Sequence, residues 1–226
     1  MLRIREAIVV EGRYDKNTLS QMVDTVIVET SGFLPRPGEV DAAYLKTAGW
    51  VHMTSLDMGL TAWAAEALAG SGTRISLDIE ATAGNCPGEV WERVLARTEA
   101  AFPNEAGLKA LTGCGTIEEG AAWMLSRGVR LVVVTCGSDG VRIFHRGGSL
   151  FHPAYEVPVK DTTGAGDCFN AAFLTGIVNG WSLERCAAYA SAAAAIAICS
   201  VGARTGLPDL AQIQRFLEER GERICD

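Results

Sequence analysis

The sequence contains no C-x-x-C pair, no cluster of histidine and cysteine, and no apolar run long enough to span a bilayer convincingly. The seven cysteines are scattered and the three histidines lie far apart, so neither a disulfide framework nor a zinc site is predicted. Lys and Arg (20) are outnumbered by Asp and Glu (27), and the net charge of −7 argues against a nucleic-acid-binding surface. No signal peptide is recognised, so a cytoplasmic protein without membrane contact is expected.

The composition is that of a well-buried globular protein. Hydrophobic residues make up 48% of the 226 positions, charged residues make up 21%, and mean hydropathy is +0.16. This length suits one medium domain with a substantial core. Cys136, Cys168, Cys186 and Cys199 lie in apolar sequence and are predicted to be small buried thiols. The histidines are assigned structural roles only.

Strand-like runs alternate with helical patterns along most of the chain. The predicted strands are Ala7–Val10, Thr25–Glu29, Trp50–Met53, Arg74–Asp78 and Val129–Thr135. The predicted helices are Asn17–Val23, Leu60–Ala69, Val90–Arg97, Glu105–Leu111 and Ile117–Ser126, followed after a hairpin over 141–151 by Gly166–Val178, Leu183–Ser200 and Leu210–Glu219. Such alternation predicts βαβ units and a mostly parallel sheet, which binds ligands at the carboxyl ends of its strands.

The most informative stretch is D-T-T-G-A-G-D at 161–167, which an alanine-rich apolar helix follows. Gly164, Ala165 and Gly166 would form the first turn of that helix. A helix start presents free N–H groups and the positive end of the dipole, which suits a phosphate or a developing oxyanion. Asp167 beside that anion site could take a proton from an attacking hydroxyl. The alternative is a glycine turn with Asp167 as a first-turn cap.

Four segments together resemble the PfkB (ribokinase-like) carbohydrate kinases. The run D-T-T-G-A-G-D-x-F-x-A-A-F resembles the C-terminal signature of that family, and V-V-V-T-C-G-S-D-G at 132–140 resembles its strand and nucleotide loop. F-P-N-E at 102–105, followed by L-T-G at 111–113, resembles its P-N-E…L-T-G segment. Residues 192–203 resemble the alanine-rich helix and small-residue loop that close over the nucleotide. The resemblance extends from about Phe33 to the C-terminus.

This resemblance implies a ribokinase-like three-layer α/β/α fold with a mostly parallel sheet. It also implies ATP-dependent phosphoryl transfer to a hydroxyl of a sugar or related small molecule, with ATP and Mg²⁺. Asp167 would be the general base, and Gly164, Ala165 and Gly166 would stabilise the transferring phosphoryl group. The resemblance assigns the nucleotide to Asn104, Thr135, Gly137, Ser138, Gly140 and Ser191. It assigns a monovalent cation such as K⁺ to Asp161, Thr163, Ala197, Ser200, Gly202 and Gly206.

Local alternatives stay open for each of these assignments. Gly137 to Gly140 also fit a plain turn, and Asn104 after Pro103 also fits a helix N-cap. The residues assigned to the cation also fit an Asp/Thr turn and a glycine-rich loop without an ion. One departure is clear, because the N-x-x-E motif of the family, which organises magnesium and phosphate, has Gly107 at its Glu position. Metal handling is therefore expected to be weak or to depend on water.

The first 33 residues do not resemble the start of such a kinase, so the fold is expected to be truncated on its N-terminal side. Two runs, A-I-V-V-E-G-R-Y-D-K at 7–16 and V-D-T-V-I-V-E-T-S-G-F at 23–33, resemble the opening of a Toprim domain without its D-x-D motif. We therefore divide the chain into a Toprim-like segment over 1–33 and a kinase-like domain over 34–226. For the structure of 1–33 we favour an ordinary βαβ unit that replaces lost kinase strands and packs into the same sheet.

The N-terminal departure also affects the expected function. The sugar contacts of the family lie largely in the N-terminal part, so we expect nucleotide binding with poor sugar turnover. A non-catalytic nucleotide-binding protein is the first alternative. A Toprim-type nucleic-acid enzyme that uses Glu11 is the second. The expected partners are a nucleotide and a small sugar, and a homodimer through an exposed sheet edge stays open.

Overall fold

The computed structural model describes residues 39–222 in full and, for the N-terminal part, the backbone of 2–3, 8–10, 23–24 and 27–29. Its centre is a six-stranded sheet in the order β10-β9-β8-β7-β6-β5. The strands are β5 (Trp50–Thr54), β6 (Arg74–Ile79), β7 (Thr98–Pro103), β8 (Leu131–Thr135), β9 (Val141–His145) and β10 (Gly148–His152). β5 to β8 are parallel, whereas β9 and β10 form an antiparallel hairpin beside β8.

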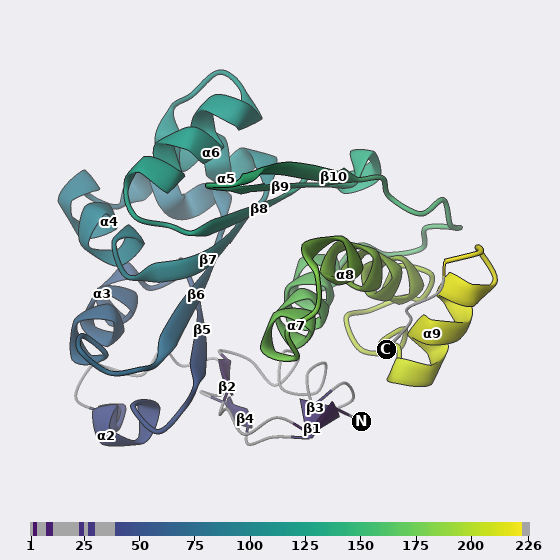
Figure 1. The fold of residues 1–226 in the computed structure, drawn as a ribbon, viewed down its shortest axis with the longest axis horizontal. Coiled ribbons are helices and arrows are strands. Elements are labelled where there is room, and N and C mark those ends of the chain that lie inside the picture. Colours follow the sequence, from purple (N-terminus) through teal and green to yellow (C-terminus); the bar gives the residue numbers. More distant parts are fainter. Residues whose placement is uncertain (1, 4–7, 11–22, 25–26, 30–38, 223–226) are drawn as a thin grey trace.

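Helices cover both faces of this sheet (Figure 1). One layer contains α2 (Ala42–Leu45), α3 (Met58–Ala67), α4 (Gly88–Leu95), α5 (Glu105–Thr112) and α6 (Ile117–Ser126). The other contains α7 (Ala165–Val178) and α8 (Leu183–Ala197), with α9 (Leu210–Glu218) packed on α8. Short 3₁₀ turns, η2 (Ala81–Asn85) and η3 (Gly137–Asp139), follow β6 and β8. The fold is therefore the predicted three-layer ribokinase-like α/β/α arrangement with a mostly parallel sheet.

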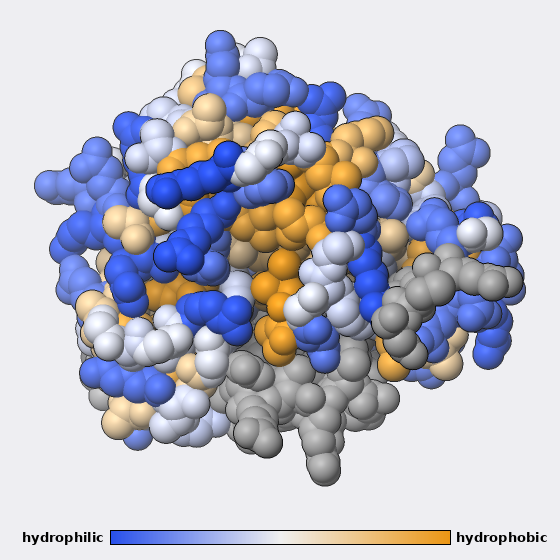
Figure 2. Space-filling view, viewed as in Figure 1, coloured by the Kyte–Doolittle hydropathy of each residue, from blue (hydrophilic) through white to orange (hydrophobic). Residues whose placement is uncertain are grey.

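Side chains of β7 and β8 alternate between two apolar cores. In β8, Val133 packs with α7 and α8, whereas Val132 and Val134 pack with the opposite helices. In β7, Phe102 packs with α7 and α8, whereas Ala101 packs with the opposite helices. Both faces of the sheet are therefore buried, which explains why these strands are continuous apolar runs. On the face shown in Figure 2, apolar side chains gather in a hollow between the sheet and α7, with hydrophilic residues around them.

Side-chain caps determine where several helices begin. At α6, the Thr116 hydroxyl accepts a hydrogen bond from the Glu119 N–H, and the Glu119 carboxylate accepts one from the Thr116 N–H, both at 3.2 Å. At α9, Asp209 and Gln212 form the same reciprocal pair at 2.8 Å. Each pair satisfies two backbone donors that a helix start leaves without partners. These caps explain why α6 has the predicted bounds and α9 starts at the predicted residue.

Strand β7 was not predicted. Its sequence, T-E-A-A-F-P, has two alanines and little β-propensity, yet it lies in the middle of the sheet and is almost entirely buried. Alanine is needed there because helices pack closely on both faces. Other differences are smaller. The helix α2 was not predicted, and α8 ends at Ala197, three residues before the predicted Ser200. The helices α3 and α4 lie two residues before their predicted bounds, and β8 starts two residues after its predicted start.

The described N-terminal backbone forms four short strands, β1 (Leu2–Arg3), β2 (Ile8–Val10), β3 (Val23–Asp24) and β4 (Ile27–Glu29). They pair in parallel as β1 with β3 and β2 with β4, and β2 lies beside β5. Most of the helix predicted over Asn17–Val23 lies outside the described residues, and Val23 itself belongs to β3. The predicted division at residue 33 also lies outside them, so the domain boundary stays a prediction.

The cysteines within 39–222 are free thiols. Cys136, Cys168 and Cys186 are buried as predicted, whereas Cys199 is only half-buried. Burial raises the pKa of the Cys168 thiol to about 12, which makes it unreactive at neutral pH. Across the described helices, none is long and apolar enough to cross a membrane. The apolar run of Ala187–Ile198 belongs mainly to α8, as part of the core.

Candidate active site

A cavity of about 790 Å³ lies where three parallel strands end and α7 begins. Asp78 and Glu80 reach it from the end of β6, Asn104 from the end of β7 and Thr135 from the end of β8. The first turn of α7, from Gly164 to Asp167, lines it from the other helical layer. The cavity therefore lies at the carboxyl edge of the sheet, where doubly wound folds bind ligands.

The start of α7 presents backbone donors to the cavity. Gly164 occupies the N-cap with a left-handed φ of 78°, and no side chain caps this end of the helix. The Ala165 N–H donates to the Thr162 carbonyl at 3.1 Å. Within the described part of the chain, no protein acceptor takes the N–H of Gly164 or of Gly166. Two of the three predicted donors therefore stay available to an anion, whereas that of Ala165 is already engaged.

Gly166 faces open space, because a methyl group added there would have no neighbouring atom within 4 Å. Gly164, in contrast, packs against the loop after α8, where an added methyl would lie 3.0 Å from the Ala203 side chain. Asp167 follows directly, is exposed to solvent and lines the same cavity. The carboxylate predicted to be the general base thus lies beside the predicted anion site.

Asp78 is a site residue that the sequence did not predict. Burial first, and then the nearby carboxylates of Glu80 and Asp167, raise its pKa from the usual 3.8 to about 7, against hydrogen bonds from Asn170 and the Ile79 backbone. An acidic residue inside the buried strand sequence R-I-S-L-D-I-E was a signal for this position, because charge is rarely placed there without a function. The site therefore holds several carboxylates that repel one another.

We expect Asp78→Asn to change how stability depends on pH. The pKa of Asp78 is about 7 in the folded state and 3.8 in the unfolded state. Between these pH values, the folded protein therefore binds a proton at Asp78 that the unfolded protein has lost. The ionised carboxylate therefore destabilises the fold increasingly from about pH 4 to pH 7 and fully above it. Urea unfolding should show that the wild type loses about 2 kcal/mol relative to the variant between pH 5 and pH 8, allowing for partial solvent screening. A pH-independent difference between the two proteins would contradict this assignment.

The loop after β8 is both a tight turn and a wall of the cavity. Its Cys136 N–H donates to the Gly140 carbonyl at 2.8 Å, and Gly140 has a φ of 105° that favours glycine. Thr135, Gly137, Ser138 and Gly140 all line the cavity. Ser191 reaches it from α8. The structure thus brings together all the residues predicted for the nucleotide.

Asn104 is the N-cap of α5, as its alternative interpretation predicted. Its side-chain oxygen accepts a hydrogen bond from the Gly107 N–H at 2.7 Å, and its amide nitrogen donates to Glu80 at 3.0 Å. Gly107 packs against the end of β6: a methyl group there would lie 2.9 Å from the carbonyl carbon of Ile79 and would overlap its oxygen. Glycine is therefore required at 107 by the close approach of α5 to β6.

We expect Gly107→Ala to destabilise the fold by about 1–2 kcal/mol. Overpacking of this kind costs roughly 1–3 kcal/mol, against a gain of about 1 kcal/mol from helix propensity. Gly88→Ala is the matched control, because Gly88 is also helical and an added methyl meets nothing within 4 Å. Denaturant titration should show a lower midpoint for Gly107→Ala and an equal or higher one for the control. Equal stability of Gly107→Ala and wild type would show that the end of β6 shifts without strain.

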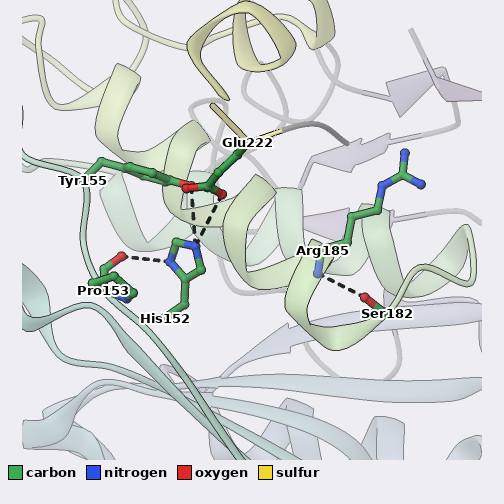
Figure 3. A network of polar contacts seen from close by, with 6 residues as sticks. All are labelled: His152, Pro153, Tyr155, Ser182, Arg185 and Glu222. Atoms are coloured by element: carbon green, nitrogen blue, oxygen red, sulfur yellow. Dashed lines mark hydrogen bonds and ion pairs between the residues drawn. The ribbon is translucent and has the colours of Figure 1, made fainter. Parts of the chain in front are cut away.

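A polar network fixes the loop after β10, which lines the cavity (Figure 3). The Tyr155 hydroxyl, on the loop that lines the cavity, donates to Glu222 at 2.8 Å. His152 Nε2 lies 3.9 Å from the same carboxylate, and its Nδ1 lies 2.8 Å from the Pro153 carbonyl. Burial and the Glu222 contact raise the pKa of Tyr155, so it stays a neutral donor. The C-terminal segment thus fixes the loop that lines the cavity, and His152 has the structural role predicted for it.

The residues predicted to hold a monovalent cation lie in the loop before α7, at the end of α8 and in the loop after it. They are Asp161, Thr163, Ala197, Ser200, Gly202 and Gly206. Asp161 accepts hydrogen bonds from the N–H and hydroxyl of Thr163 at 2.9 and 2.7 Å and from the Gly202 N–H at 2.7 Å, and these bonds lower its pKa. A methyl group at Gly206 would overlap the Ala197 carbonyl oxygen, so the loop after α8 packs closely on the end of that helix. The Asp161 carboxylate therefore joins the two loops.

The charge of the cavity is negative. Its lining, all from the described residues, includes Asp78, Glu80, Glu156 and Asp167, and no Lys or Arg. Among residues 39–222, no three Asp, Glu, His or Cys side chains converge closely enough to hold a metal ion by themselves. A phosphate ligand would therefore meet backbone donors and carboxylates, which requires that it arrive with its own cation.

The three-layer fold is that of the ribokinase-like proteins. Residues 40–210 match the model of the pfkB family carbohydrate kinases, and the chain belongs to that family. It is 31% identical to an ATP-dependent ribose-1-phosphate kinase of Halopiger xanaduensis over 81% of the chain, and 32% identical to a ribokinase of Arabidopsis thaliana over 68% of it. The chain spans 60% and 41% of the length of these two relatives.

A solved structure shows the same relationship. The Arabidopsis thaliana ribokinase in complex with ribose and ATP superposes with a TM-score of 0.71 at 26% identity, covering 87% of this chain and 72% of that one. The family match begins at residue 40, so it does not bear out the Toprim resemblance of residues 1–33. Glu11, on which the nucleic-acid alternative depends, lies outside the described residues.

Proposed function

We propose that this chain transfers the γ-phosphoryl group of ATP to a hydroxyl of a sugar or related small molecule. The observation that carries the proposal is the juxtaposition, in one cavity, of the Gly164 and Gly166 N–H groups, the exposed Asp167 carboxylate and the loop Thr135–Gly140. Phosphoryl transfer needs positioning, charge stabilisation and an activated hydroxyl, and these groups can supply all three. Because the named relatives are a ribokinase and a ribose-1-phosphate kinase, we place ribosyl acceptors first.

In the proposed mechanism, Asp167 accepts the proton of the acceptor hydroxyl as its oxygen approaches the phosphorus. The N–H groups at the start of α7 donate to the phosphoryl oxygens as charge develops on them. The loop after β8 and the loop around Tyr155 enclose the rest of the nucleotide. Asp78, partly protonated near neutral pH because of burial and its neighbours, limits the negative charge that faces the phosphates.

Mg²⁺ is the divalent ion that the donor set fits. Carboxylate and amide oxygens are the ligands it prefers, and it usually keeps several waters and binds through substrate phosphates. Glu80 and Asn104 line the cavity and would face the ion or its waters. Bound there, Mg²⁺ would neutralise phosphate charge that no cavity-lining Lys or Arg offsets.

The test of this function is an ADP-release assay with ATP and Mg²⁺ across pentoses, ribose phosphates, hexoses, keto-deoxy acids and nucleosides. We expect acceptor-dependent release with at least one class. Nucleotide binding without release for any of them would favour the non-catalytic alternative. That result would support the nucleotide-binding site and contradict the proposed phosphoryl transfer.

A non-hydrolysable ATP analogue with Mg²⁺ should raise the melting temperature of the protein. A ligand that binds only the folded state stabilises it by about 2.7 kcal/mol at a hundred times its Kd. The shift should be much smaller when EDTA removes the metal, because the cavity lining contains four carboxylates and no cationic side chain. Differential scanning fluorimetry measures both conditions. The absence of any shift at millimolar nucleotide with Mg²⁺ would refute nucleotide binding.

We also propose a K⁺ ion at the loops joined by Asp161. The proximity of backbone carbonyls, one carboxylate and the Thr163 hydroxyl supports a hard, weakly charged ion there. Replacing KCl by choline chloride at equal ionic strength should reduce any ADP release and the thermal stability of the nucleotide complex. Equal values in the two salts would argue against the ion.

We propose further that the protein forms a homodimer through β10. This strand is the last of the six-stranded sheet, and its Phe151 is 55% exposed. An apolar side chain on a strand whose outer edge pairs with no strand of the described residues favours pairing with a second copy. Light scattering of the wild type at micromolar concentration should give twice the monomer mass. The Phe151→Lys variant should give a lower mass. A monomeric wild type would refute this proposal.

A further inference from the structure

Glu80 lies where the end of β6 meets the start of α5. Its side chain lines the cavity and accepts a hydrogen bond from the Asn104 amide nitrogen at 3.0 Å. Its backbone is fixed from β5, because its N–H donates to the Ser55 hydroxyl at 3.0 Å and the Ser55 N–H donates to the Asp78 carbonyl at 2.9 Å. The carboxylate is thus held in the cavity from two sides.

Asn104 is bound at both ends of its amide. Its oxygen accepts from the Gly107 N–H at 2.7 Å and its nitrogen donates to Glu80. These two bonds fix the orientation of the amide, because its oxygen and its nitrogen each have their own partner. Glu80 is the partner of the nitrogen. Without the Glu80 carboxylate, the amide nitrogen would lose this acceptor.

The same corner explains why position 107 has no acidic side chain. The carbonyl of Ile79 occupies the space that any Cβ at 107 would need. Glu80 is the next residue after Ile79, so the backbone that excludes a side chain from 107 also delivers a carboxylate to Asn104. The acidic group is thus contributed by β6 instead of α5.

We infer that Glu80 takes the place of the missing acidic residue at position 107, as a positioning residue that orients Asn104 and retains the Mg²⁺ that accompanies the nucleotide. This inference rests on the proposed function. The Glu80 carboxylate lies in the same cavity lining as Asp78 and Asp167. The ion would interact with Glu80 through its water shell, because no three acidic side chains of the described residues converge on one point.

The test is calorimetric titration of an ATP analogue at a series of free Mg²⁺ concentrations, for the wild type, Glu80→Gln and Glu80→Ala. Outer-shell groups typically change metal affinity by roughly ten- to a hundredfold. We expect Glu80→Gln, which keeps an acceptor for Asn104, to raise the Mg²⁺ concentration for half-maximal binding by about tenfold, and Glu80→Ala to raise it further. Glu89→Gln, an exposed position on α4, is the matched control.

The melting temperature without ligand separates this role from a structural one. Removing one of several repelling carboxylates should leave it unchanged or slightly higher in Glu80→Gln. If the wild type binds the analogue with Mg²⁺ and Glu80→Gln shows the same Mg²⁺ dependence, the inference about Glu80 is overturned while the proposed function stands. If the wild type itself shows no binding, the proposed function fails.

Discussion

Asp167→Asn should lower phosphoryl transfer by roughly a hundredfold to ten-thousandfold. The substitution keeps the shape of the side chain and removes its ability to accept the proton of the attacking hydroxyl. A hundredfold loss corresponds to about 2.7 kcal/mol of transition-state stabilisation. Asp167 is exposed in the first turn of α7, so the amide should fit without repacking. Steady-state ADP release with a saturating acceptor measures the effect.

The same variant should bind nucleotide at least as tightly as the wild type. Asp167 is one of four carboxylates that line a cavity without Lys or Arg, and its charge contributes to the raised pKa of Asp78. Removing it lowers the repulsion of phosphates, so kcat should fall while the Kd for the nucleotide stays constant or decreases. Glu89→Gln controls for loss of one negative charge elsewhere. Full activity of Asp167→Asn would show that another group accepts the proton.

The parts of the site that the sequence predicted are those encoded locally. The α7 turn, the loop after β8 and the Asn104 cap each depend on residues within a few positions, with glycines that the backbone conformation requires. A resemblance in short ordered motifs is enough to find such segments. This explains why the predicted nucleotide residues line one cavity.

What the sequence did not reveal depends on contacts across the chain. Strand β7 has weak β-propensity and is defined by its neighbours β6 and β8. Asp78 and Glu80 precede Asn104 by 26 and 24 residues and reach it only because parallel strands end at one edge. The absence of Glu at 107 suggested weak metal handling, yet only the packing of Gly107 on Ile79 shows why the position is glycine. Local sequence patterns do not encode such contacts between residues that lie far apart in the chain.

The start of α7 offers a direct test of the anion site through Gly166. Gly166→Val places a branched side chain in space that is open, since an added methyl meets nothing within 4 Å. The fold should tolerate it, because Gly166 is helical and exposed. Nucleotide binding should be impaired, because the phosphates need the volume in front of the Gly164 and Gly166 N–H groups. We therefore expect nucleotide affinity to fall by about a hundredfold or more, a loss near 2.7 kcal/mol.

Thermal shift separates the two effects. At a nucleotide concentration of about a hundred times the wild-type Kd, binding stabilises the wild type by about 2.7 kcal/mol, whereas a hundredfold weaker site leaves about 0.4 kcal/mol. For a chain of this size the difference corresponds to a fall in the ligand-induced shift from roughly 5–10 °C to about 1 °C. Gly88→Val, also in the first turn of a helix with open space around it, should keep the full shift. A Gly166→Val protein that keeps the wild-type shift would place the phosphates elsewhere, because a site that depends on close backbone approach cannot accept a side chain at its centre.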